Sequence, residues 1–113
     1  MITIVKTSRE TTKIENYKMT MSPEINTLKD VADGTIIEVD AWLEFVETKE
    51  DGEEVEILSI LATDGQTYSC QSATFKNSFH DIDNIMAGDE YSIKKISGTT
   101  KAGRPYIDCV LNA

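Results

Sequence analysis

The sequence predicts an all-β fold class, a small barrel that carries one helix, built as a single domain over residues 1–113. Three observations favour it. Apolar and polar residues alternate along the segment 35–48, which is typical of a half-buried strand. Short turn signals containing Gly separate this segment from two further β-like runs. Only one stretch, residues 72–86, shows the apolar spacing of an amphipathic helix.

Three consecutive strands are expected in the region 35–71. In the first, the apolar positions share one parity: Val39, Ala41, Leu43 and Phe45. After a Gly-containing turn at 50–53, the run Glu54–Thr63 is apolar on both faces in its second half, as in a strand that is covered on both sides. Asp64-Gly65 is a hairpin signal, and we expect the chain to return from it as a third strand, Gln66–Gln71.

A helix and a second hairpin are expected next. Ser72 is an N-cap residue and Gly88 occupies the C′ position of the predicted helix. Between them the apolar residues recur at helical spacing, so that they form a buried stripe: Phe75, Phe79, Ile82, Ile85 and Met86. Tyr91–Ser97 and Arg104–Leu111 are predicted as two strands joined by the loop 98–103.

The segment before residue 35 is expected to contain little regular structure. Ile2–Val5 and Lys13–Met21 read as extended, so residues 1–22 are predicted as an extended or β-like N-terminal segment. Ile25–Gly34 is expected to form a turn or one short helical piece.

The predicted order of elements is that of a five-stranded OB-fold barrel. In that fold the helix lies between strands three and four, and the ligand lies across strands two and three and the loops that flank them. An all-β sandwich would need no helix at this point of the chain. An α+β open sheet with one covering helix stays open as an alternative.

Charge restricts the partners of this protein. The chain has 11 basic and 20 acidic residues and a net charge of −9, which argues against a partner held only by neutralisation of phosphates. The excess lies in residues 21–64, where two basic and 13 acidic residues give −11. The last hairpin is basic between residues 91 and 107, with four cations and no acid: Lys94, Lys95, Lys101 and Arg104. An acidic protein can therefore still present one positive surface.

The sequence does not favour a membrane protein, a disulfide-stabilised protein or a metal-binding protein. No apolar run approaches the about 20 residues that cross a bilayer, and Met1–Lys6 is shorter than a signal peptide, so an intracellular location is expected. Cys70 and Cys109 are too few for a disulfide framework, and even with His80 they are too few for a zinc site. We expect two reduced, buried thiols.

No enzymatic or cofactor motif is found. Gly98 and Gly103 have the spacing of phosphate-loop glycines, but Arg104-Pro105 stands where Lys-Ser/Thr is required, and the loop joins two strands. His80 has no nucleophile placed beside it by any motif. The carboxylates of 44–56 lack the pattern of a Ca²⁺ loop. We therefore expect a binding protein without a cofactor or a metal.

Three separated segments resemble one protein family in the same order: Thr27–Glu38, Ala62–Ser69, and Gly98–Gly103 leading into Tyr106. The family is that of the single-stranded DNA-binding proteins of small protein-primed tailed phages that infect Gram-positive bacteria, and the likeness runs from about Tyr17 to Leu111. It implies a barrel in the host cytoplasm that coats and protects strands displaced during phage DNA replication, without sequence preference. The hairpin 44–56 departs from the family pattern because it is richer in carboxylates, which repel phosphate.

Binding of single strands requires aromatic faces for bases and a positive groove for the backbone. Trp42 falls on the polar parity of its strand, so we expect it to face the ligand; a β-bulge that turns it into the core is the alternative. Tyr106 also has outward parity, because Ile107 and Cys109 belong to the core phase. Tyr68 faces either the ligand or the core. The predicted backbone track is the basic hairpin, with Lys94, Lys95, Lys101 and Arg104.

Two classes of function remain. The first is a non-sequence-specific single-stranded DNA-binding protein of phage replication, and the second is an acidic protein-binding module or a DNA mimic that inhibits a host nucleic-acid enzyme. Single-stranded DNA is the expected partner and no membrane is expected. Self-association along DNA and contacts with phage replication proteins are left open, since four basic N-terminal residues fit either a second DNA patch or an arm that contacts another subunit: Lys6, Arg9, Lys13 and Lys18.

Overall fold

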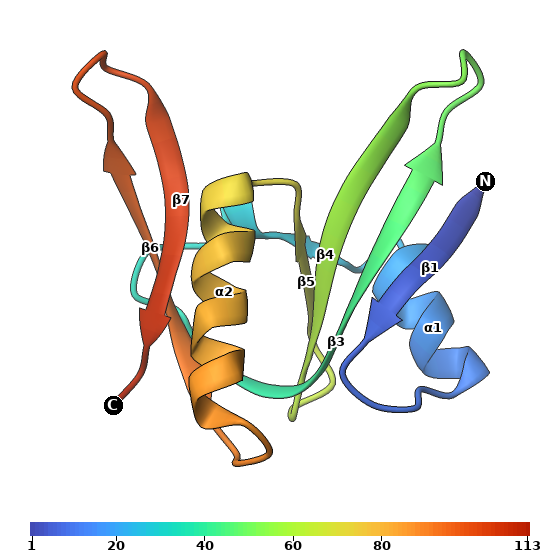
Figure 1. Ribbon diagram of the computed structural model, residues 1–113, viewed down its shortest axis with the longest axis horizontal. Coiled ribbons are helices and arrows are strands. Elements are labelled where there is room, and N and C mark those ends of the chain that lie inside the picture. The colour runs from blue at the N-terminus through green and yellow to red at the C-terminus, as the bar shows by residue number, and fades with distance from the viewer.

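The computed structural model describes residues 1–113 as a curled, mostly β half-barrel with two helices (Figure 1). One seven-stranded sheet has the order β2-β5-β4-β3-β6-β7, and β1 pairs with β3 beside this path. The elements are β1 (Ile2–Thr7), α1 (Lys13–Thr20), β2 (Asn26–Thr27), the 3₁₀ turn η1 (Leu28–Asp30), β3 (Ile36–Thr48), β4 (Glu54–Ala62), β5 (Thr67–Cys70), α2 (Ala73–Met86), β6 (Ser92–Thr99) and β7 (Pro105–Leu111).

The long strand β3 connects two hairpin arms. Its first residues, 36–38, pair with β6, and residues 39–48 pair with β4. The β3–β4 arm and the β6–β7 arm diverge from this shared strand, and their tips lie far apart at the top of Figure 1. The helix α2 packs against β7 and lies between β7 and β5 in the same view. The arms are therefore joined at one end of the molecule and open at the other.

Two hydrophobic clusters lie on opposite faces of the sheet. The inner cluster contains Phe75 and Phe79 of α2, both fully buried against residues of β3, β4, β6 and β7. The outer cluster contains Met19 of α1 and residues of β3 and β4. The second half of β4 contributes to both clusters, since Leu58 and Ile60 belong to the inner one and Leu61 to the outer one. This confirms the prediction that β4 is covered on both faces.

The expected outward orientation of Trp42 is wrong, and a β-bulge explains why. Val39 pairs with Ala62 and Ala41 pairs with Leu61, so β3 has one extra residue, Asp40, at this point. The extra residue reverses the alternation that follows it. Ala41 therefore faces the outer cluster, and Trp42 turns into the inner one, where it is 4% exposed.

The expectation of an extended segment at Lys13–Met21 is also wrong. Residues 13–20 form the helix α1, which begins with a capping box. The amide of Glu15 donates to the Thr12 hydroxyl over 3.1 Å, and the Glu15 carboxylate accepts from the Thr12 amide over 2.9 Å. In the segment 25–34 the short helical piece is η1, and it follows the two-residue strand β2.

A buried lysine of β6, Lys95, binds the segment that follows η1 and holds it against this strand. The Lys95 ammonium, on a side chain 4% exposed, donates to the Val31 carbonyl over 2.7 Å and to a carboxylate oxygen of Asp33 over 2.9 Å. The Ser97 hydroxyl donates to the other oxygen of that carboxylate. Gly34 and Thr35 continue the tie through backbone bonds to Lys95. Because a buried cation must be paired, these bonds hold the η1 segment in one position.

Replacing Phe79 by Ala tests the packing of α2. We expect the free energy of unfolding to fall by about 3–5 kcal/mol, because a fully buried ring is lost from contact with Trp42, whose ring centroid lies 6.2 Å away. Urea unfolding measures this change. Ile85→Ala is the control on the same helix; the side chain is 79% exposed, so its loss should stay within about 0.5 kcal/mol. Equal losses in the two variants would contradict the packing.

Acid should weaken the tie at Asp33. The Ser97 hydroxyl, and next the Lys95 ammonium, hold the pKa of Asp33 below its usual value. A lowered folded-state pKa means that the carboxylate stabilises the fold above the unfolded pKa, near 4, and that this stabilisation is lost as the pH falls through the folded pKa. Asp33→Asn should therefore flatten the decline of the urea midpoint between about pH 5 and pH 2.

The control for this measurement is Asp30→Asn, on an exposed side chain of the same segment. It should leave the acid slope of stability close to that of the unmodified protein. An Asp33→Asn profile that runs parallel to the unmodified one would show that this carboxylate contributes nothing.

Candidate nucleic-acid interface

A groove of about 800 Å³ lies between the two arms. One wall comes from β4 and β5 and includes Ile57 and Cys70, and the other comes from β6 and β7 and includes Pro105 and Tyr106. The segment of β2 and η1 adds Thr27 and Lys29. The groove therefore combines parts of the chain that are up to 80 residues apart, and only the curvature of the sheet brings them together.

Tyr106 is the aromatic residue of this groove. It belongs to β7 and pairs with Gly98 of β6, and its side chain is 37% exposed. Cys109, of the opposite phase, is buried, so the expected outward parity of Tyr106 holds along β7. Its ring therefore lies on the face of the hairpin opposite to Lys95 and Ile107, and a partly exposed ring is chemically suited to stacking on a flat ligand.

The other two predicted aromatics lie elsewhere. Trp42 packs edge-on against His80 of α2, with 4.9 Å between the ring centroids, and it does not line the groove. His80 in turn pairs with Glu44. Tyr68 is half-buried against the inner cluster, where burial raises the pKa of its hydroxyl. Of the three candidates, the structure brings only Tyr106 to the groove.

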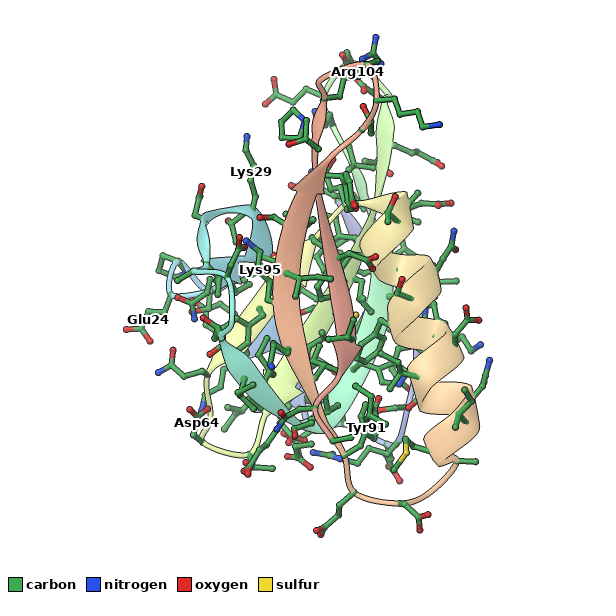
Figure 2. All side chains as sticks on the ribbon, turned by 90° about the vertical axis from the view of Figure 1, so that its left-hand side faces the viewer. Glu24, Lys29, Asp64, Tyr91, Lys95 and Arg104 are labelled. Carbon is green, nitrogen blue, oxygen red and sulfur yellow. The ribbon has the colours of Figure 1, made fainter.

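The predicted cations divide in a similar way. Lys101 and Arg104 lie at the exposed tip of the β6–β7 arm and take part in no ion pair; Figure 2 shows Arg104 at this tip. Lys95 lines the groove, but its ammonium is held by Val31 and Asp33, which corrects its assignment to the free backbone track. Lys94 is partly exposed, makes no ion pair and lies on the same face of the hairpin as Tyr106, so its place on the backbone track stays a prediction.

Lys29 is a groove cation that the sequence analysis missed. It is exposed, it lines the groove and it makes no ion pair. Figure 2 shows it above Lys95, on the segment that the Lys95 tie fixes. Its sequence neighbours are Leu28 and Asp30, so no basic cluster marked it. The one available signal was its place inside the first segment that resembles the phage family.

The two arm tips carry opposite charges. The β3–β4 arm exposes six carboxylates and the β6–β7 arm exposes Lys101 and Arg104. The carboxylates are those of Glu47, Glu50, Asp51, Glu53, Glu54 and Glu56. A polyanion entering the groove is consequently attracted to the β6–β7 side and repelled from the other tip.

The remaining titratable groups form no further cluster in the groove. No group of three or more His, Cys, Asp and Glu side chains is arranged to hold a metal ion. Cys70 and Cys109 are free and buried as predicted, and burial raises the pKa of these thiols to about 11 and about 12. None of the helices is both long enough and apolar enough to span a membrane.

Comparison with known proteins identifies the relatives of this chain. The family described as phage single-stranded DNA-binding protein matches residues 2–112. The single-stranded DNA-binding protein of Bacillus phage phi29 is 25% identical over 118 aligned residues, which cover 96% of this chain and 95% of that protein. No solved structure matches. The family match includes both arms and every groove-lining residue, and the chain belongs to the family of phage single-stranded DNA-binding proteins.

Proposed function

We propose that the protein coats and protects the single strands displaced during phage DNA replication in the host cytoplasm, binding them without sequence preference in the groove between its arms. Membership of the family supports the ligand class. The observation that carries the location is the groove itself, whose lining includes both Tyr106, with its partly exposed ring, and Lys29, whose ammonium makes no ion pair. Lys101 and Arg104 would extend the positive track toward the arm tip.

The free energies of base stacking and of charge repulsion allow an acidic protein to bind single-stranded DNA. A base stacked on an aromatic ring contributes about 1–3 kcal/mol, and this contact acts at van der Waals distance. Repulsion from the net charge of −9 acts mainly at longer range, and it is screened beyond about 8 Å at physiological salt. The carboxylates of the opposite arm then guide the strand toward the basic arm and do not prevent its binding.

The fold supports the same location if it is interpreted as an OB-fold. In that interpretation β3, β4, β5, β6 and β7 are the five barrel strands of one domain, α2 lies between the third and fourth, and residues 1–22 are an extension. The ligand of an OB-fold lies across strands two and three and the flanking loops. Those strands would be β4 and β5, which supply Ile57 and Cys70 to the groove.

A DNA mimic remains the second candidate, because the β3–β4 arm exposes a concentrated set of carboxylates. A mimic would occupy the nucleic-acid site of another protein and would itself bind no DNA. Titration of labelled oligo(dT), followed by fluorescence anisotropy, separates the two candidates. Saturable binding favours our proposal, and a steepened isotherm would in addition reveal self-association along the strand.

Tyr106→Ala should weaken oligo(dT) binding by about 1–3 kcal/mol, which is about 5- to 150-fold in Kd, because one stacked base is lost. Fold stability should change little, since the ring is partly exposed. Tyr17→Ala is the matched control, because Tyr17 is an exposed tyrosine of α1 outside the groove. Equal affinities of the two variants would remove Tyr106 from the binding site.

Lys29→Ala and Lys101→Ala should each lower the salt dependence of binding. The slope of log Kd against log salt should decrease by about 0.7 for every phosphate contact removed from a single strand. Lys49→Ala, at an exposed position outside the groove lining, is the control for a change in net charge alone. If Lys49→Ala lowers the slope as much as the other two, the cations act through overall charge and no defined track exists.

A further inference from the structure

We infer that Gly98 is a positioning residue that holds the ring of Tyr106 in place as a flat stacking surface. The inference rests on the proposed function, since it concerns how the same groove is prepared for its ligand. It starts from a feature that separates Gly98 from every other glycine of the chain.

The backbone does not require glycine at position 98. Five of the six glycines have a φ between 81° and 90°, which L side chains rarely adopt, and a Cβ added to any of them would meet nothing within 4 Å. Gly98 lies within β6, and its φ is outside that region. A glycine inside a strand weakens the strand because it orders a freer backbone and packs no side chain. Its presence here therefore needs another reason.

Tyr106 supplies that reason. Gly98 pairs with Tyr106 across the β6–β7 hairpin, so their side-chain positions are neighbours on one face of the sheet. A Cβ on Gly98 would lie 2.5 Å from the Tyr106 hydroxyl oxygen, 2.6 Å from Cζ and 3.0 Å from Cε1. The ring thus lies directly across the backbone of Gly98, in space that any other residue would fill.

This contact defines the ring as a binding surface. The Gly98 backbone supports the ring on one side, and 37% of the side chain remains exposed. A ring already held in one orientation loses less rotational freedom when a base stacks on it than a free side chain would lose. Any Cβ at position 98 would push the ring off its support, so Gly98 would act on the ligand only through Tyr106.

A purely structural role of the Gly98–Tyr106 contact predicts a different result. An aromatic side chain that covers a strand glycine can simply stabilise the hairpin. In that case Gly98→Ala would change the urea midpoint and leave the affinity for DNA unaltered. A positioning role instead couples the two residues in binding, which a double-mutant cycle measures directly.

The experiment compares oligo(dT) affinity in the full chain for Gly98→Ala, Tyr106→Ala and the double variant. We expect Gly98→Ala to weaken binding by about 5-fold or more in the unmodified background. In the Tyr106→Ala background it should weaken binding by less than about twofold, since no ring is left to displace. Thr99→Ala, at the next and exposed position of β6, is the control and should leave binding unchanged.

Three results would overturn the inference: additive losses in the cycle, an unchanged affinity for Gly98→Ala, or an equal loss for Thr99→Ala. Should Gly98→Ala not fold, proton NMR of the unmodified protein still tests the contact. The ring current should shift the chemical shifts of the Gly98 α-protons upfield, and these shifts should return to ordinary values in Tyr106→Ala. Unshifted Gly98 α-protons in the unmodified protein would show that the ring does not lie over Gly98. Failure of the unmodified protein to bind oligo(dT) would refute the proposed function instead.

Discussion

The packing of α2 against β3 is the interaction on which the groove depends. Phe79 meets the ring of Trp42 at 6.2 Å and at nearly a right angle, and both side chains are buried. Because the helix lies at the joined end of the two arms, it keeps the inner faces of the sheet apart there and leaves them open above (Figure 1).

The charge of the molecule is separated in space, and this separation makes a net charge of −9 compatible with a polyanionic ligand. Acidic residues collect on one arm tip and basic residues on the other. The protein also uses one groove cation for structure, since Lys95 binds Asp33 and Val31. That tie orders the segment bearing Lys29, so a buried ion pair fixes the position of an exposed cation. Counting basic residues in the sequence cannot separate these two uses.

Most strands and α2 could be predicted because their signals are local: alternating apolar residues, turn residues and the Ser72 cap, whose hydroxyl accepts from the Phe75 amide. The failures have physical causes. The bulge at Asp40 has no Gly or Pro to mark it, yet one extra residue reverses every orientation that follows. In α1 the capping box was present in the sequence, but Met19 is the one buried residue of the helix, so α1 has no buried apolar stripe like that of α2.

Some parts of the candidate site could be predicted from the sequence and others could not. The orientation of Tyr106 followed from parity because the pairing of β6 with β7 has no register shift, whereas Trp42 lies just beyond one. Parity, however, describes one strand at a time. It could not show that Tyr106 lies over Gly98, because that contact depends on the register between two strands. The residues that complete the groove are therefore defined by tertiary structure, and a glycine that looks like a weak point in its strand becomes, in the folded chain, the support of the partly exposed ring of Tyr106.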